Sequence, residues 1–233
     1  MKQAYDSGAM TTKTRIMDAA ERLFAEKGFD AASLRAITAA AGVNLAAVNY
    51  HFRSKDALIE AVFARKLEPL SRKRLELLGR YESEGGGRPV PVEKILRALL
   101  EPLIHLSREP SSGWDKFRML VGRMYTAPKA QRIFVRELEE SMRRFGAAMQ
   151  RACPQLSFED LCWRVYFIIG AMAHALASGT ILEIISQGKC SARQLEAGIE
   201  RLITFAAAGL QAPPAGKGAG AGGRRGRQRC VTD

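Results

Sequence analysis

A chain of 233 residues can form one large domain or two modest ones, and its 47% hydrophobic and 26% charged residues exclude a disordered or fibrous protein. The formal net charge of +12 suits a polyanionic partner, such as nucleic acid or an anionic membrane surface. Four scattered cysteines fit neither a zinc site nor a disulfide framework, so we expect a cytoplasmic protein without a metal or cofactor.

The first eighty residues show the periodicity and the capping residues of four helices. The first ten residues are expected to be disordered, and the first helix then runs to Gly28. The predicted N-caps of the four helices are Thr11 or Thr12, Ser33, Asn44 and Ser54. The fourth helix is long and reaches about Arg80, before a glycine-rich connection at 81–91.

The rest of the chain is also predicted to be helical. Further helices are expected at about 92–107, 113–124, 128–151, 157–187 and 191–209. No alternation of β-branched residues indicates a strand, so we predict an all-α fold. The segment 165–182 approaches the length of a membrane span, but its histidine and small residues favour a buried helix in a dimer instead.

Two short predicted helices meet around Gly42, with the spacing of a helix-turn-helix motif. Glycine at this turn can take a left-handed backbone conformation without strain. The residues that would join the two helices are Leu34, Ile37, Val43 and Val48. The residues left facing outward are Leu45, Ala46, Ala47 and Asn49. The small side chains of Ala46 and Ala47 permit close approach to the major groove of DNA, and Asn49 can hydrogen-bond a base edge or a phosphate.

The stretch AAERLFAEKGFDAASLRAITAAAGVNLAAVNYHFRSKDALI closely resembles the DNA-binding domain of the TetR family of bacterial regulators. The resemblance rests on Gly42-Val43, Tyr50-His51-Phe52, Ser54-Lys55 and Leu58 in register. It implies DNA contacts from Ser33, Asn44, Leu45, Ala46, Ala47, Asn49, Tyr50, His51 and Lys55. The chain departs from the pattern at Leu45, where many members have Lys or Pro, and at Asn49, where many have an aromatic residue.

This resemblance implies three regions. Residues 1–56 would form a three-helix DNA-binding domain, 57–211 a larger helical domain for ligand binding and dimerisation, and 212–233 a flexible basic tail. The tail is either a solvated end or a source of additional, sequence-independent DNA affinity. The protein would be a repressor that binds a palindromic operator in double-stranded DNA as a homodimer, paired through its last two helices.

A small hydrophobic effector is the expected ligand of the larger domain. A looser similarity of 44–52 and 163–167 to fatty-acid regulators of pseudomonads implies a fatty acid or acyl-coenzyme A. Candidate cavity residues are Phe117, Leu120, Met124, Phe134, Phe145, Phe167 and His174, although apolar residues at helical spacing more often lie in a core.

An enzyme and a helical scaffold or adaptor are the two alternative classes of protein. An enzyme is not expected, because the chain has no HExxH, P-loop or GxSxG motif and no catalytic residues can be assigned. A helical scaffold or adaptor remains the alternative, and it would show neither specific DNA binding nor a response to a ligand.

Overall fold

The computed structural model describes residues 11–108, 113–124, 127–177, 179–191 and 195–214. Every regular element in these ranges is a helix, which confirms the predicted all-α fold. The predicted disordered N-terminus and most of the predicted basic tail lie outside the described residues. Among the helices of the described part, none is long and apolar enough to cross a membrane.

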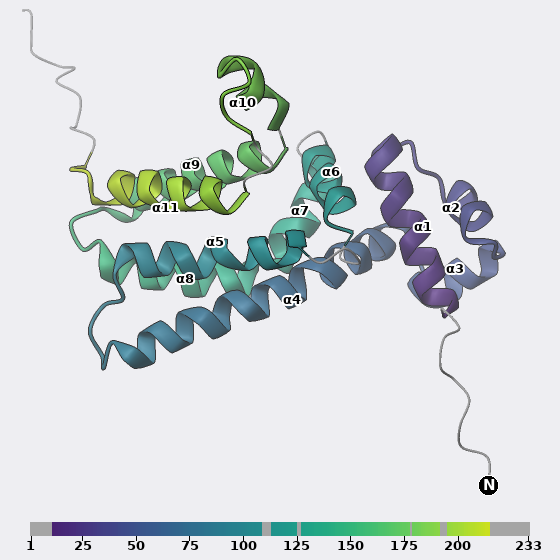
Figure 1. The fold of residues 1–233 in the computed structure, drawn as a ribbon. Coiled ribbons are helices and arrows are strands. Elements are labelled where there is room, and N and C mark those ends of the chain that lie inside the picture. Colours follow the sequence, from purple (N-terminus) through teal and green to yellow (C-terminus); the bar gives the residue numbers. More distant parts are fainter. Residues whose placement is uncertain (1–10, 109–112, 125–126, 178, 192–194, 215–233) are drawn as a thin grey trace, which may run out of the picture.

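The chain forms a small N-terminal domain and a larger C-terminal domain that share one long helix. The N-terminal domain contains α1 (Thr12–Lys27), α2 (Leu34–Ala41) and α3 (Leu45–Phe52), and the shared helix is α4 (Lys55–Glu84). The C-terminal domain adds α5 (Val92–Arg108), α6 (Trp114–Met124), α7 (Pro128–Glu137), α8 (Glu139–Ala152), α9 (Phe158–Ala177), α10 (Gly179–Ile185) and α11 (Leu195–Gln211). Figure 1 shows α1 to α3 at one end of the molecule, with α4 running from them along the larger domain.

The first four helices begin at the residues predicted to cap them. The side-chain oxygens of Thr11, Ser33, Asn44 and Ser54 each accept a hydrogen bond from the backbone N–H three residues later. Each cap satisfies one of the N–H groups that a helix start leaves without a partner. These local signals therefore fix where the N-terminal helices begin.

A continuous hydrophobic core runs through both domains. In the N-terminal domain, Ile16, Phe24, Ile37 and Val48 are fully buried, and on α4 Leu58 closes this part of the core. The predicted inward residues Leu34 and Val43 are partly buried against the same cluster. The N-terminal domain is thus held to α4 by apolar packing rather than by a flexible linker.

One long predicted helix is interrupted. The predicted helix at 128–151 is divided at Leu138 into α7 and α8. Of the predicted helix at 157–187, the structure describes α9 up to Ala177 and α10 from Gly179 to Ile185, and residue 178 between them lies outside the described residues. The Leu138 N–H bonds to the carbonyl oxygen of Val135, three residues back, instead of continuing the α-helical pattern. The predicted glycine-rich connection begins later than expected, because α4 continues past Arg80 and ends at Glu84.

Candidate DNA-binding surface and ligand cavity

The turn between α2 and α3 depends on Gly42. Its φ of 63° and ψ of 40° are left-handed, as predicted for this position. The N–H of Val43 bonds to the carbonyl oxygen of Thr38 at 3.0 Å, which closes the end of α2. From α1, the guanidinium of Arg15 donates to the carbonyl oxygens of Ala41 at 2.6 Å and Gly42 at 3.1 Å, so α1 holds the turn in place.

The residues with implied DNA contacts lie around α3 and at the starts of α2 and α4. Six of the nine are exposed: Ser33, Asn44, Leu45, Ala46, Asn49 and Tyr50. Three are half-buried: Ala47, His51 and Lys55. Tyr50 has 83% of its surface exposed, whereas its neighbours Val48 and Phe52 are buried in the core. Helix α3 therefore presents one polar, small-residue face to solvent and packs the other against the domain.

Three of these residues also have structural roles. The side-chain oxygens of Ser33 and Asn44 cap α2 and α3, which leaves the Ser33 hydroxyl hydrogen and the Asn44 amide NH₂ as hydrogen-bond donors for another partner. The Lys55 ammonium donates to the carbonyl oxygen of Asp30 at 3.1 Å, which ties the start of α4 to the loop between α1 and α2. These contacts hold the three side chains in defined orientations.

Sequence reasoning did not single out several cations of this surface. Arg53, which follows α3 with a φ of 61°, and Arg35 on α2 are both exposed. Lys13 from α1 lines a shallow depression together with His51 and Arg53. Phosphate contacts need positive charge but no fixed spacing, so a sequence motif does not reveal which basic residues converge in space.

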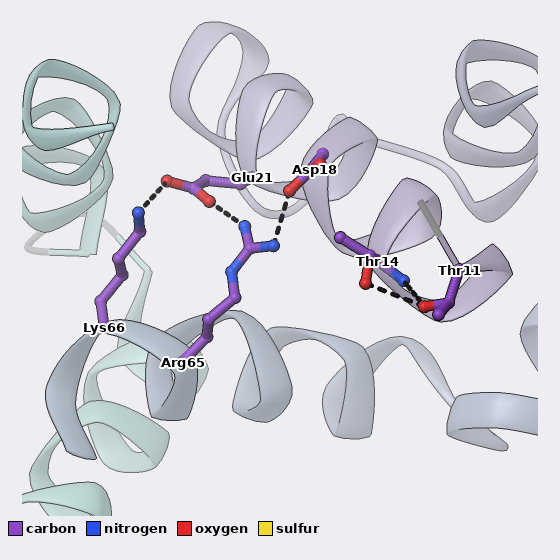
Figure 2. Close-up of polar contacts among 6 residues, drawn as sticks. All are labelled: Thr11, Thr14, Asp18, Glu21, Arg65 and Lys66. Atoms are coloured by element: carbon purple, nitrogen blue, oxygen red, sulfur yellow. Dashed lines mark hydrogen bonds and ion pairs between the residues drawn. The ribbon is translucent and has the colours of Figure 1, made fainter. Parts of the chain in front are cut away.

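An ionic cluster joins the N-terminal domain to α4 (Figure 2). Glu21 of α1 is 3% exposed, and its carboxylate pairs with the guanidinium of Arg65 and with the Lys66 ammonium at 3.6 Å. Arg65 also donates to Asp18 at 2.6 Å. Because this carboxylate is buried between two cations, the cluster fixes the angle between α1 and α4.

A second set of contacts reaches the N-terminal domain from α6 and α7. Arg123 of α6 donates to the carbonyl oxygen of Glu26 at 3.0 Å, near the end of α1. Lys129 of α7 pairs with Asp56 of α4 at 2.7 Å. The C-terminal domain therefore contacts the N-terminal domain directly, in addition to sharing α4 with it.

The C-terminal domain encloses a cavity of about 160 Å³. It is lined by side chains from α4 to α9, almost all of them apolar. The polar exceptions are Arg74 of α4 and Ser141 of α8, which are both buried. Burial lowers the pKa of Arg74 to about 10, so its guanidinium remains charged at neutral pH.

The structure separates the seven candidate ligand-binding residues into two groups. Phe117, Met124, Phe134 and Phe145 line the cavity. Leu120 is fully buried in the core and does not line it, while Phe167 and His174 are exposed outside it. In α9 the cavity is lined by Val165, Ile169, Met172 and Ala173. Successive residues of a helix are rotated by about 100°, so Phe167 lies on nearly the opposite side of α9 from Val165. Residues close to the cavity in sequence can therefore face away from it.

The outer face of the C-terminal domain is unusually apolar on α9 and α11. Trp163, Tyr166 and Phe167 are more than half exposed on α9, and Phe205 is 71% exposed on α11. The Trp163 ring lies 6.1 Å from that of Tyr166 and 5.7 Å from that of Phe167, so the three form one aromatic patch. Large exposed apolar patches of this kind mark interaction surfaces.

Two family models match the chain. The model described as "Bacterial regulatory proteins, tetR family" matches residues 16–62, and "Tetracyclin repressor-like, C-terminal domain" matches residues 97–209. The transcriptional regulator UidR of Escherichia coli K12 is 40% identical over 60 residues, which are 26% of this chain and 31% of UidR. AcrR of Shigella flexneri is 31% identical over 134 residues, which are 53% of this chain and 57% of AcrR. The chain thus matches between a third and somewhat over half of the length of these relatives.

Solved structures with low sequence identity share the fold. The fatty acid degradation regulator FadR from Bacillus halodurans matches with a TM-score of 0.59 and 16% identity, over 88% of this chain and 99% of that one. SmeT, the repressor of the Stenotrophomonas maltophilia efflux pump SmeDEF, matches with a TM-score of 0.55 and 20% identity, over 84% of this chain and 90% of that one. At these identities the similarity establishes the architecture of both domains.

Proposed function

Because the chain belongs to the tetR family of bacterial regulatory proteins, we propose that it is a transcriptional repressor that a small hydrophobic effector releases from operator DNA. Family membership also confirms that the chain is a regulator and not an enzyme. The observation that carries the proposal is the exposed face of α3, which stands on a turn fixed by Gly42 and Arg15.

The face of α3 has the form that a major groove accepts. Leu45 and Ala46 at its start are exposed and carry no charge, which allows close approach to base edges and thymine methyl groups. Asn49 one turn later is exposed and can donate and accept hydrogen bonds. Tyr50, His51 and the capped start of α4 are placed to hold phosphates on either side.

The operator would be read by a homodimer. The aromatic patch on α9 together with Phe205 of α11 offers an apolar face that a second copy of the chain can cover. Paired through this face by a two-fold axis, two α3 helices can enter successive major grooves about one duplex turn, roughly 34 Å, apart. A palindromic operator follows from that symmetry.

The effector would bind in the cavity of the C-terminal domain. Its apolar lining favours a hydrophobic compound such as a fatty acid. Binding would alter DNA affinity only through a difference in effector affinity between the DNA-bound and the free arrangement, commonly ~1–3 kcal/mol. Phe117, Met124, Phe134 and Phe145 are the predicted contacts on the apolar side.

An electrophoretic shift on DNA from upstream of the chain's own gene, with nonspecific competitor, tests the proposal. We expect a specific shift that a hydrophobic effector abolishes. Tyr50→Ala should weaken binding to every duplex, because Tyr50 is 83% exposed on α3 and its hydroxyl can donate a hydrogen bond to a phosphate. Lys73→Ala, an exposed change far along α4, is the matched control and should bind normally. If no upstream fragment shifts, the helical adaptor becomes the better interpretation.

A further inference from the structure

Arg74 interrupts the apolar inward face of the second half of α4. The inward positions of this part of α4 are Leu67, Leu70, Arg74 and Leu78, which follow one another at helical spacing. Arg74 is only 5% exposed, and it lines the cavity together with Leu67 and Leu70. Charged residues are almost never fully buried without a partner, so we expect a partner for the charge of this guanidinium.

Within the protein, the guanidinium of Arg74 uses little of its hydrogen-bonding capacity. Its Nε donates to the carbonyl oxygen of Leu99 on α5 at 2.7 Å, which uses one of five N–H donors. No carboxylate pairs with it in the described part of the chain, whereas Arg65, Arg97 and Arg144 all have carboxylate partners. Burial alone lowers its pKa, with no contribution from an acidic neighbour. A charge that is buried, retained at neutral pH and unpaired points to an anion supplied from outside the chain.

The second polar group of the cavity is also a buried hydrogen-bond donor without a partner in the described part of the protein. Ser141 of α8 is 4% exposed, and its hydroxyl makes no hydrogen bond to any residue that the structure describes. A guanidinium and a hydroxyl are both donors, and a carboxylate offers two oxygens that a guanidinium can hold with two parallel bonds. All other lining side chains are apolar. The cavity therefore offers hydrogen-bond donors to one anionic group and apolar surface to the remainder of a ligand.

The size of the cavity limits that remainder. Its volume of about 160 Å³ is close to that of a ~150 Å³ protein cavity that accepts benzene. Along α4, seven residues separate Leu67 from Arg74, or roughly 10 Å at 1.5 Å per residue. A single ring or a short alkyl chain fits this space. The several phosphate charges of coenzyme A would need more cations than the one that the lining provides.

We infer that the effector is a small organic monocarboxylate whose carboxylate binds Arg74 and Ser141 and whose ring or short alkyl chain fills the apolar cavity. The inference rests on the proposed function for the assignment of the cavity to the effector, and it selects a free carboxylic acid over a coenzyme A thioester. Arg74 lies farther along α4 from the N-terminal domain than Leu67 does, so the apolar end of the ligand points toward that domain.

Calorimetric titration of the full chain in the absence of DNA tests the inference. The probes are octanoate, benzoate and the uncharged 1-octanol. The wild type should bind octanoate about ten- to a hundredfold more tightly than 1-octanol, because only the carboxylate gains charge-assisted hydrogen bonds. Arg74→Met, which keeps the length and removes the charge, should lose that preference, so that octanoate and 1-octanol bind it with similar affinity. Arg74→Lys should keep part of it.

Arg72→Met is the matched control, because Arg72 lies on the same helix with its side chain 72% exposed. It should bind all probes as the wild type does. Equal affinity of the wild type for octanoate and 1-octanol, or failure of both carboxylates to bind, would overturn the inference without any use of the Arg74 variants. An operator shift measured separately reports on the proposed function, so a repressor that binds DNA but ignores carboxylates would refute only this inference.

Discussion

Replacing Gly42 by alanine should destabilise the N-terminal domain through two separable effects. The first is backbone strain, because Gly42 has a φ of 63° and a left-handed alanine costs about 1–2 kcal/mol. The second is a collision, because the new Cβ would lie 2.9 Å from the terminal nitrogen of Arg15. Arg15 can move aside, but it would then lose its bonds to the carbonyl oxygens of Ala41 and Gly42, worth about 1–2 kcal/mol. The expected total loss of unfolding free energy is about 2–4 kcal/mol.

Gly86→Ala provides the matched control for the strain alone. Gly86 follows α4 with a φ of 56°, and a Cβ added there would meet nothing within 4 Å. This variant should therefore lose only the ~1–2 kcal/mol of strain. Urea unfolding followed by circular dichroism at one fixed protein concentration would measure both losses, since the stability of a dimer depends on concentration.

The same comparison in an Arg15→Met background isolates the collision. There the contact is already absent, so Gly42→Ala should cost no more than Gly86→Ala does. The reasoning is refuted if Gly42→Ala and Gly86→Ala lose equal stability in the wild type, or if the additional loss persists without Arg15.

Three other variants test the ionic cluster between α1 and α4, the dimer interface and the bend of α4. Glu21→Gln should cost about 1–3 kcal/mol of unfolding free energy because it removes the buried negative charge that Arg65 and Lys66 contact, whereas Glu76→Gln in an exposed pair should cost less than about 1 kcal/mol. Trp163→Glu should give monomers in sedimentation velocity and abolish the specific operator shift, and a variant that remains dimeric would exclude this face as the interface. Pro69→Ala should raise the thermal midpoint yet weaken release of DNA by octanoate, and undiminished release would show that flexibility at this proline is not required.

The N-terminal domain could be predicted from sequence because its signals are local. Four capping side chains and one left-handed glycine determine where its helices begin and where they turn. The division at Leu138 had no such signal, because neither glycine nor proline stands there. It arises from tertiary packing, since α7 forms ion pairs with α4 through Lys129 and Arg136 while α8 contributes Phe145 to the cavity.

The cavity could be predicted only in part. Aromatic and methionine side chains predict an apolar cavity, but hydropathy alone does not show which face of α9 turns inward, and Phe167 and His174 lie on its outer face. Arg74 is not among the predicted ligand-binding residues, although the sequence carries a signal for it. It is the one charged residue in an otherwise leucine-only stripe of α4, and such an interruption of an apolar pattern is a better indication of a ligand contact than another hydrophobic residue.

The position of the cavity along α4 suggests how an effector would reach the DNA-binding surface. Leu67 lines the cavity, and the preceding residues Arg65 and Lys66 hold Glu21 of α1. Arg65, Lys66 and Leu67 belong to the same turn of α4 but point to different sides of the helix. A ligand that pushes this turn through Leu67 therefore also moves the two cations on the other side. Pro69 lies one turn further on and has no N–H, so the carbonyl oxygen of Arg65 lacks its usual helical donor and α4 can bend at this turn with little loss. A carboxylate held at Arg74 and an apolar body pressed against Leu67 would therefore act across the most easily bent turn of the helix that carries the N-terminal domain.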